Sequence, residues 1–104
     1  MKRTTGLKAR DTENLHNRVR RDRIRVAVAA WAYEKGPTPS MSDQEYDALS
    51  LRVHKYRKVA TGNSRLDNFF KRHFDHYTSL WIHKHPDQEG LRRIYLSVYR
   101  NHGY

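Results

Sequence analysis

The chain of 104 residues contains no cysteine, and this absence removes several kinds of chemistry at once. Disulfide bonds, thiolate nucleophiles and cysteine-ligated zinc or iron–sulfur sites are all excluded. The fold must therefore be held by packing and hydrogen bonds. A chain of this length supplies one domain with one modest hydrophobic core.

Long apolar runs are also absent. No stretch approaches the roughly 20 apolar residues that a membrane span requires. The basic start, MKRTTGLKARD, is followed by no apolar run of signal-peptide length. We therefore expect a cytoplasmic protein that does not enter a membrane.

Catalytic and metal-binding signatures are missing as well. The sequence has seven histidines, but it has no nucleophile-elbow sequence, no glycine-rich phosphate loop and no paired acids in a recognisable frame. His73 with His76, and His83 with His85, have usable spacings for a metal, yet two ligands do not complete a zinc site. We predict a protein that is not an enzyme and has no native metal site.

Strand signals are scarce, because no segment sustains the alternation of apolar and polar residues that a half-buried strand needs. Helical spacing recurs instead, and the three prolines fall between the helical segments. The segment 75–87 is expected to be an irregular or short-helical connector. The four predicted helices run from about Asp11 or Thr12 to the residue before Gly36, from about Asp43 to Val59, from a cap at Ser64 to about Phe74, and from about Asp87 to near Gly103.

These segments predict an all-α fold, a small four-helix bundle whose first two helices form an antiparallel hairpin around residues 36–41. Residues 1–10 are polar, basic and without period, so we expect a mobile basic arm there. Residues 11–104 are expected to form a single helical domain. Its predicted core comprises Leu15, Val19, Val26, Ala30, Tyr33, Tyr46, Leu49, Val53, Tyr56, Leu66, Phe69, Phe70, Phe74, Trp81, Leu91, Ile94, Tyr95 and Val98.

Positive charge is the strongest compositional feature. The chain has 21 Lys and Arg against 11 Asp and Glu, and residues 1–25 hold nine of the former and three of the latter, so six of the ten excess charges lie in the first quarter. Guanidinium groups match phosphate oxygens. We predict a small non-catalytic accessory protein that binds DNA or RNA through phosphate contacts, with little sequence choice. The predicted contacts are Arg18, Arg20, Arg21, Arg23 and Arg25.

Two other uses of this charge fit the same residues. The arginines could form a solvated helix face with local ion pairs to Asp11, Glu13 and Asp22. Alternatively, the basic surface could bind or inhibit an acidic partner protein. In size and style the chain resembles the accessory proteins that phages and mobile elements encode.

The segment around Ser42 carries a clear helix start. Ser42 followed by Glu45 is a capping box, in which each side chain bonds the backbone amide of the other residue. Asp43 and Asp47 add negative charge near the positive end of the helix dipole. A structural role in starting the helix therefore accounts for these four residues without any ligand.

The longer segment from residue 33 to residue 49, YEKGPTPSMSDQEYDAL, resembles the N-terminal helical subdomain of NAD-dependent DNA ligases. In that family an aromatic helix end, a proline-containing turn and an Asp-x-Glu-Tyr-Asp motif bind the nicotinamide mononucleotide (NMN) half of the cofactor. The resemblance implies that NMN or NAD contacts fall here on Tyr33, Asp43, Tyr46 and Asp47. A ring can stack on nicotinamide, and carboxylates can accept hydrogen bonds from ribose hydroxyls.

The chain also departs from that family. Glu34 stands where the family usually has a second aromatic residue or a histidine, and Pro37 replaces a common aspartate. The Lys-x-Asp-Gly motif of nucleotide transfer does not occur. The resemblance therefore implies a ligand-binding module and not a ligase.

Overall fold

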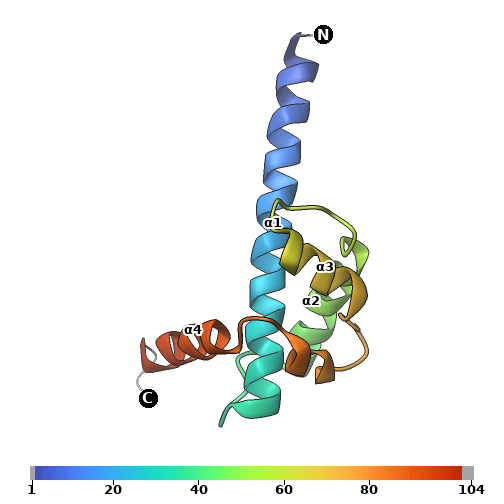
Figure 1. Cartoon of the computed structure of the whole chain (residues 1–104). Helices are drawn as coiled ribbons and strands as arrows, with labels where there is room; N and C mark the ends of the chain where they lie inside the picture. Colours follow the sequence, from blue (N-terminus) through green and yellow to red (C-terminus); the bar gives the residue numbers. More distant parts are fainter. Residues whose placement is uncertain (1, 102–104) are drawn as a thin grey trace.

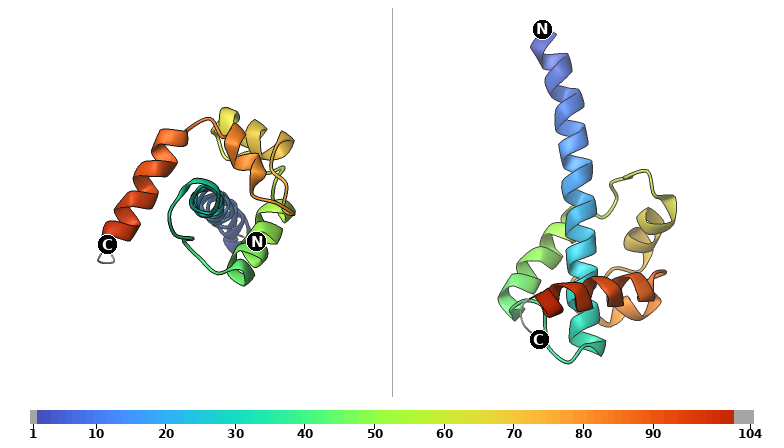
Figure 2. Two further views of the ribbon diagram at one scale, coloured as in Figure 1. Left: turned by 90° about the horizontal axis from the view of Figure 1, so that it is seen from below. Right: turned by 90° about the vertical axis from the view of Figure 1, so that its left-hand side faces the viewer.

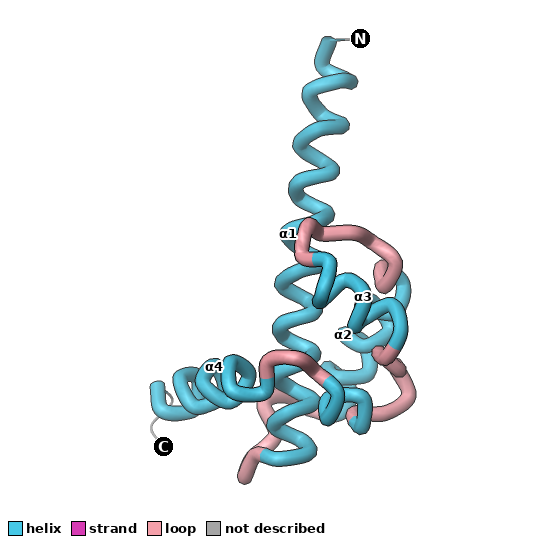
Figure 3. Tube along the Cα trace, in the orientation of Figure 1, coloured by secondary structure: helices cyan, strands magenta, loops and turns pink. Residues whose placement is uncertain are grey.

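The computed structural model describes the backbone of residues 2–101 and the side chains of residues 14–98. Within these residues the chain forms helices and no strands (Figures 1 and 3), so the predicted all-α class is confirmed. The elements are α1 (Lys2–Lys35), α2 (Asp43–Lys55), α3 (Ser64–Arg72), the short 3-10 helix η1 (Leu80–Lys84) and α4 (Gln88–Asn101).

Helix α1 is the axis of the molecule. The chain descends along α1 and returns along α2, which confirms the predicted antiparallel hairpin (Figure 1). Figure 2 shows α2, α3 and α4 arranged around the C-terminal half of α1, with α4 lying across it. The N-terminal turns of α1 extend beyond the other elements, so the bundle is built on one half of a long helix.

The start of α1 differs from the prediction. The helix begins at Lys2 instead of at Asp11 or Thr12, so residues 2–10, expected to be an arm, have helical backbone. These residues include Lys, Arg, Ala and Leu, which favour helix, and only Gly6 strongly opposes it. The mobility expected for this segment stays a prediction.

The end of α1 depends on a close approach to α4. A side chain on Gly36 would place its Cβ 2.9 Å from Cζ of Tyr95. The hydroxyl of Tyr95 donates to the carbonyl of Thr38 at 2.8 Å and accepts from the amide of Thr38 at 3.1 Å. Glycine is required here for space, and the tyrosine ties α4 to the loop between α1 and α2.

The predicted capping box at the start of α2 is confirmed. The amide of Glu45 donates to the Ser42 hydroxyl at 3.1 Å, and the Ser42 amide donates to the Glu45 carboxylate at 3.3 Å. The helix ends at Lys55 and not at Val59. Beyond it, the carbonyls of Tyr56, Arg57 and Val59 accept hydrogen bonds from an arginine of α1 instead of continuing the helix.

The starts of the later helices shift by one residue. Asn63, and not the predicted Ser64, caps α3, because its side chain accepts from the amide of Leu66 at 3.1 Å. Asp87 precedes α4 and accepts from the amide of Gly90 at 3.0 Å. The predicted stop near Gly103 lies outside the described residues.

An aromatic core fills the space between the helices. Phe69, Phe70, Phe74 and Trp81 form a contiguous ring cluster. Among the other predicted core residues, Val19, Val26, Ala30, Leu49, Val53, Leu91 and Tyr95 are buried, Leu15, Tyr46, Tyr56 and Leu66 are half-buried, and Tyr33, Ile94 and Val98 are exposed.

The exposure of Tyr33 is a correction with a functional consequence. Tyr33 is 61% exposed at the last turn of α1. The exposed ring is open to contact, and a ligand that covers it would remove a large apolar area from water.

Candidate functional site

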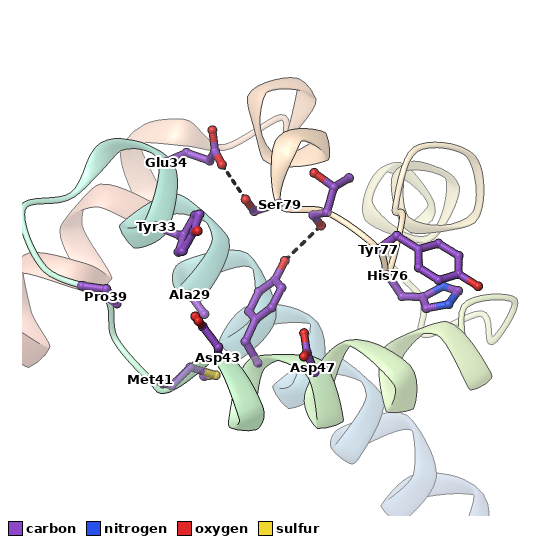
Figure 4. A pocket seen from close by; sticks show the side chains of 12 residues that line it. Ala29, Tyr33, Glu34, Pro39, Met41, Asp43, Asp47, His76, Tyr77 and Ser79 are labelled. Atoms are coloured by element: carbon purple, nitrogen blue, oxygen red, sulfur yellow. Dashed lines mark hydrogen bonds between the residues drawn. The ribbon is translucent and has the colours of Figure 1, made fainter.

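A cavity of about 390 Å³ lies between the last turns of α1, the first turns of α2 and the segment 76–79 (Figure 4). The structure brings together in this cavity all the residues that the ligase resemblance assigns to a nicotinamide ligand. They are Tyr33, Asp43, Tyr46 and Asp47.

Helix α2 contributes both aspartates and the tyrosine. Asp43 and Asp47 are four residues apart, which places both exposed carboxylates on one side of the helix. Asp43 points from α2 toward Tyr33, whereas Asp47 lies farther along α2 on the side of His76 and Tyr77 (Figure 4). Tyr46 is half-buried beside them and its hydroxyl donates to the carbonyl of Thr78 at 3.3 Å. Burial raises the pKa of Tyr46, so its hydroxyl keeps its proton.

Glu34 also lines the cavity, although the sequence comparison marked it only as a departure from the ligase pattern. The hydroxyl of Ser79 donates to its carboxylate at 2.5 Å, and Nε2 of His83 lies 3.2 Å from the other carboxylate oxygen. The bond from Ser79, with a smaller contribution from His83, lowers the pKa of Glu34. The carboxylate is therefore ionised at neutral pH.

The far wall of the cavity consists of residues that the ligase resemblance did not name. His76 and Tyr77 lie in contact, with ring centroids 3.9 Å apart, and His76 also lies 4.2 Å from the ring of His54. Tyr77 is 86% exposed. The segment 76–79 has no helical period and begins 21 residues after the last residue of α2. The histidine and tyrosine rings of this segment were the only feature of the sequence that indicated a place in the cavity wall.

The charge of the cavity is opposite to the charge of the protein. Glu34, Asp43 and Asp47 line it, and no described lysine or arginine does. His76 is the only side chain in its lining that could carry positive charge. The cavity thus combines three carboxylates with aromatic rings.

The predicted arginine set divides into two groups, and Arg23 is the clearest correction. Its side chain is 5% exposed, its Nη1 donates to Asp67 at 2.7 Å, and its Nη2 donates to the carbonyl of Val59 at 2.9 Å. The guanidinium also lies 5.3 Å from the centre of the Phe70 ring. Arg23 therefore joins α1 to α3 and cannot reach a phosphate.

Arg20 is also engaged within the molecule. Its guanidinium donates to the carbonyl of Thr61 and, at 3.1 Å, to the side chain of Asn17. Arg18, Arg21 and Arg25 are exposed and form no hydrogen bond or ion pair with the described side chains. We call these three the outer arginines.

The outer arginines share one side of α1. Arg18 and Arg21 line a surface hollow with Asn14 and Asn17, and all three outer arginines line the adjoining hollow with Arg52. Arg52 itself is paired with Asp22, its Nε lying 2.9 Å from the carboxylate. Three guanidinium groups without partners among residues 14–98 are therefore presented together to solvent.

The described part of the chain contains no cluster of three or more histidine and acidic side chains suited to a metal ion. In the same part, no helix has the length and apolar character needed to cross a membrane.

No family model matches the chain, and no curated protein or solved structure is similar to it. The resemblance to the ligase subdomain therefore stays an expectation from the sequence of residues 33–49.

Proposed function

We propose that the protein is a non-catalytic binding module whose cavity holds the nicotinamide nucleoside part of NMN or NAD. One observation supports this proposal above the others. Four residues chosen by their likeness to a nicotinamide-binding segment, and spread over two helices, line the same cavity.

The chemistry of the cavity fits this ligand. Its volume of about 390 Å³ falls in the range of roughly 300 to 1,000 Å³ that small-molecule sites occupy. The exposed ring of Tyr33 offers a surface on which a nicotinamide ring can stack, and Asp43 and Asp47 can accept hydrogen bonds from ribose hydroxyls. No described lysine lines the cavity to attack a phosphate, so we propose binding without nucleotide transfer.

Calorimetric titration with NMN tests this proposal. We expect NMN to bind the wild type, and we expect Asp47→Asn to weaken binding about tenfold or more, because a hydrogen bond to a charged group contributes roughly 1.5 to 3 kcal/mol. Glu89→Gln is the matched control, because Glu89 is an exposed acid on α4 outside the cavity. A wild type that shows no heat and no rise in melting temperature with millimolar NMN would contradict the proposal.

The outer arginines favour a second function, the binding of DNA or RNA through phosphate contacts. The observation behind it is the exposure of Arg18, Arg21 and Arg25 on one side of α1 without partners among the described side chains. Guanidinium groups in this state can each contact a phosphate. This function uses a surface separate from the cavity, so both can belong to one protein.

Fluorescence anisotropy with labelled DNA and RNA tests the second function. Replacing all three outer arginines with glutamine should greatly weaken binding at low salt. A charge-matched control replaces Lys71, Arg72 and Arg93, which are exposed on α3 and α4, and should bind more tightly than the first variant. Equal losses in the two variants would show that only net charge matters. Binding of polyglutamate without any binding of DNA or RNA would favour an acidic protein partner instead.

A further inference from the structure

The cavity is acidic in a protein whose net charge is +10. Three of the chain's 11 acidic residues line it, and none of its described lysines and arginines does. Charge of one sign at a concave site selects ligands of the opposite sign. The local charge therefore constrains the ligand more closely than the resemblance to a nucleotide-binding segment does.

We propose that the cavity selects the cationic, oxidised pyridinium ring with its ribose and leaves the phosphate of the nucleotide without a protein partner. Nicotinamide riboside, which has no phosphate, would then be a complete ligand. This inference rests on the proposed function, because it names the part of a nicotinamide nucleotide that the same cavity recognises.

The lining offers no described lysine or arginine that would hold a phosphate. Phosphate sites in proteins use arginine, lysine or the free amides at a helix N-terminus. The N-terminus of α2 lies at the cavity, where the capping box bonds the amides of Ser42 and Glu45. The amides of Asp43 and Gln44 stay open, next to the carboxylate of Asp43 itself. Asp43 adds a negative charge to the same turn. A phosphate dianion placed among these carboxylates would be repelled.

The same lining suits a flat cation. Tyr33 and Tyr77 present exposed rings at the cavity, and the face of a tyrosine ring attracts a positive charge. Glu34 is held in its ionised form by the bond from Ser79. Oxidised nicotinamide nucleosides carry a positive charge on the ring, whereas the reduced dihydropyridine ring is neutral. The cavity should therefore distinguish the two oxidation states.

Two pairs of ligands, each differing in one chemical feature, test the inference on the whole chain by calorimetry at fixed ionic strength. Nicotinamide riboside against NMN isolates the phosphate, and oxidised against reduced riboside isolates the ring charge. A charge-assisted phosphate contact would favour NMN by about tenfold or more. We expect any advantage of NMN over the riboside to stay below about fivefold. We expect the affinity for the oxidised riboside to exceed that for the reduced form by about fivefold or more.

The opposite results overturn the inference and leave the proposed function standing. These are an advantage of NMN of about fivefold or more, or a difference between the two oxidation states below about fivefold. If none of the compounds binds, the proposed function fails and the inference fails with it.

A double variant links the selectivity to the carboxylates. Asp43→Asn with Asp47→Asn should remove most of the preference for the oxidised riboside, while Glu89→Gln should keep it. Circular dichroism of both variants checks that they are folded, and both aspartates are exposed, so a large loss of stability is not expected. A folded double variant with the full preference would contradict the assignment.

Discussion

The two sides of α1 carry the same type of residue in opposite roles. On the outer side, Arg18, Arg21 and Arg25 are exposed and unpaired among the described side chains. On the inner side, Arg23 is buried and bonded to Asp67 of α3 and to backbone carbonyls of the turn after α2. An arginine-rich segment therefore holds exposed arginines on one side and a buried arginine that joins helices on the other.

The geometry of the helix separates these roles. At 3.6 residues per turn, the three outer arginines fall within about 60° of one another around the axis, whereas Arg23 lies on the opposite side. Arg23 shares its side with Val19, Val26 and Ala30, which are buried. The count of arginines in a segment is thus a poor guide to how many can touch a ligand.

The largest effect expected from this comparison is the loss of Arg23. We predict that Arg23→Ala lowers the free energy of unfolding by about 3 kcal/mol, because the half-buried Asp67 loses its ion-pair partner and the Val59 carbonyl loses its donor. Urea unfolding measures the change. Arg21→Ala, its exposed counterpart, should change stability by less than about 0.5 kcal/mol. Similar losses in the two variants would remove the distinction between inner and outer arginines.

The next effect concerns the salt dependence of binding to duplex DNA. Each neutralised phosphate contributes about −0.9 to the slope of log K against log salt, so the loss of three outer arginines should make the slope shallower by about 2.7. Between about 50 and about 200 mM salt, the advantage of the wild type should then shrink by about 40-fold. Anisotropy titrations over this range provide the measurement. An unchanged slope would show that the outer arginines do not contact phosphates.

Acid should selectively weaken the contact between Arg23 of α1 and Asp67 of α3. Burial, the largest single influence, acts to raise the pKa of Asp67, but hydrogen bonds from Thr61 and Arg23 together with the charge of Arg23 outweigh it and lower the pKa. Because the folded pKa lies below the ordinary value of 3.8, this stability is present above pH 3.8 and is lost as pH falls through the folded pKa.

Comparison of the wild type with Asp67→Asn checks the acid effect. Near neutral pH the wild type should be more stable, and its advantage should narrow as the pH falls below 3.8. The stability lost on protonation of Asp67 should be smaller than the stability lost in Arg23→Ala, since protonated Asp67 can still accept the bond from the Thr61 amide. An advantage that stays constant down to pH 2 would contradict this assignment.

The sequence allowed good prediction of which segments are helical, although α1 begins earlier and α2 ends sooner than predicted. Where the prediction was right, it rested on short-range chemistry. The capping box at Ser42 and the spacing of Leu49 and Val53 depend on neighbours within one or two turns. The carbonyls that bind Arg23 lie more than thirty residues away, so its partners were beyond local pattern. Its place on the face of Val19 and Val26 was the available signal.

The residues that line the cavity were predicted only in part, because some of them come from a segment distant in sequence. The resemblance named the residues from α1 and α2, and the structure brings them together. The wall formed by His76 and Tyr77 comes from a segment that packs across the cavity through the bond between Tyr46 and Thr78. A contact of this range depends on the tertiary fold. The ligand that the cavity takes stays a proposal.

A change at Arg20 should have the smallest effect on stability. It tests the division between inner and outer arginines most sharply, because Arg20 lies between the two sides of α1. Its bond to the Thr61 carbonyl predicts that Arg20→Gln lowers the free energy of unfolding by about 1 kcal/mol. Since its guanidinium is engaged within the molecule, the slope of DNA binding against salt should stay unchanged. Urea unfolding and the salt titration measure the two quantities on one variant. A slope shallower by about 0.9 with unaltered stability would instead place Arg20 with the outer arginines.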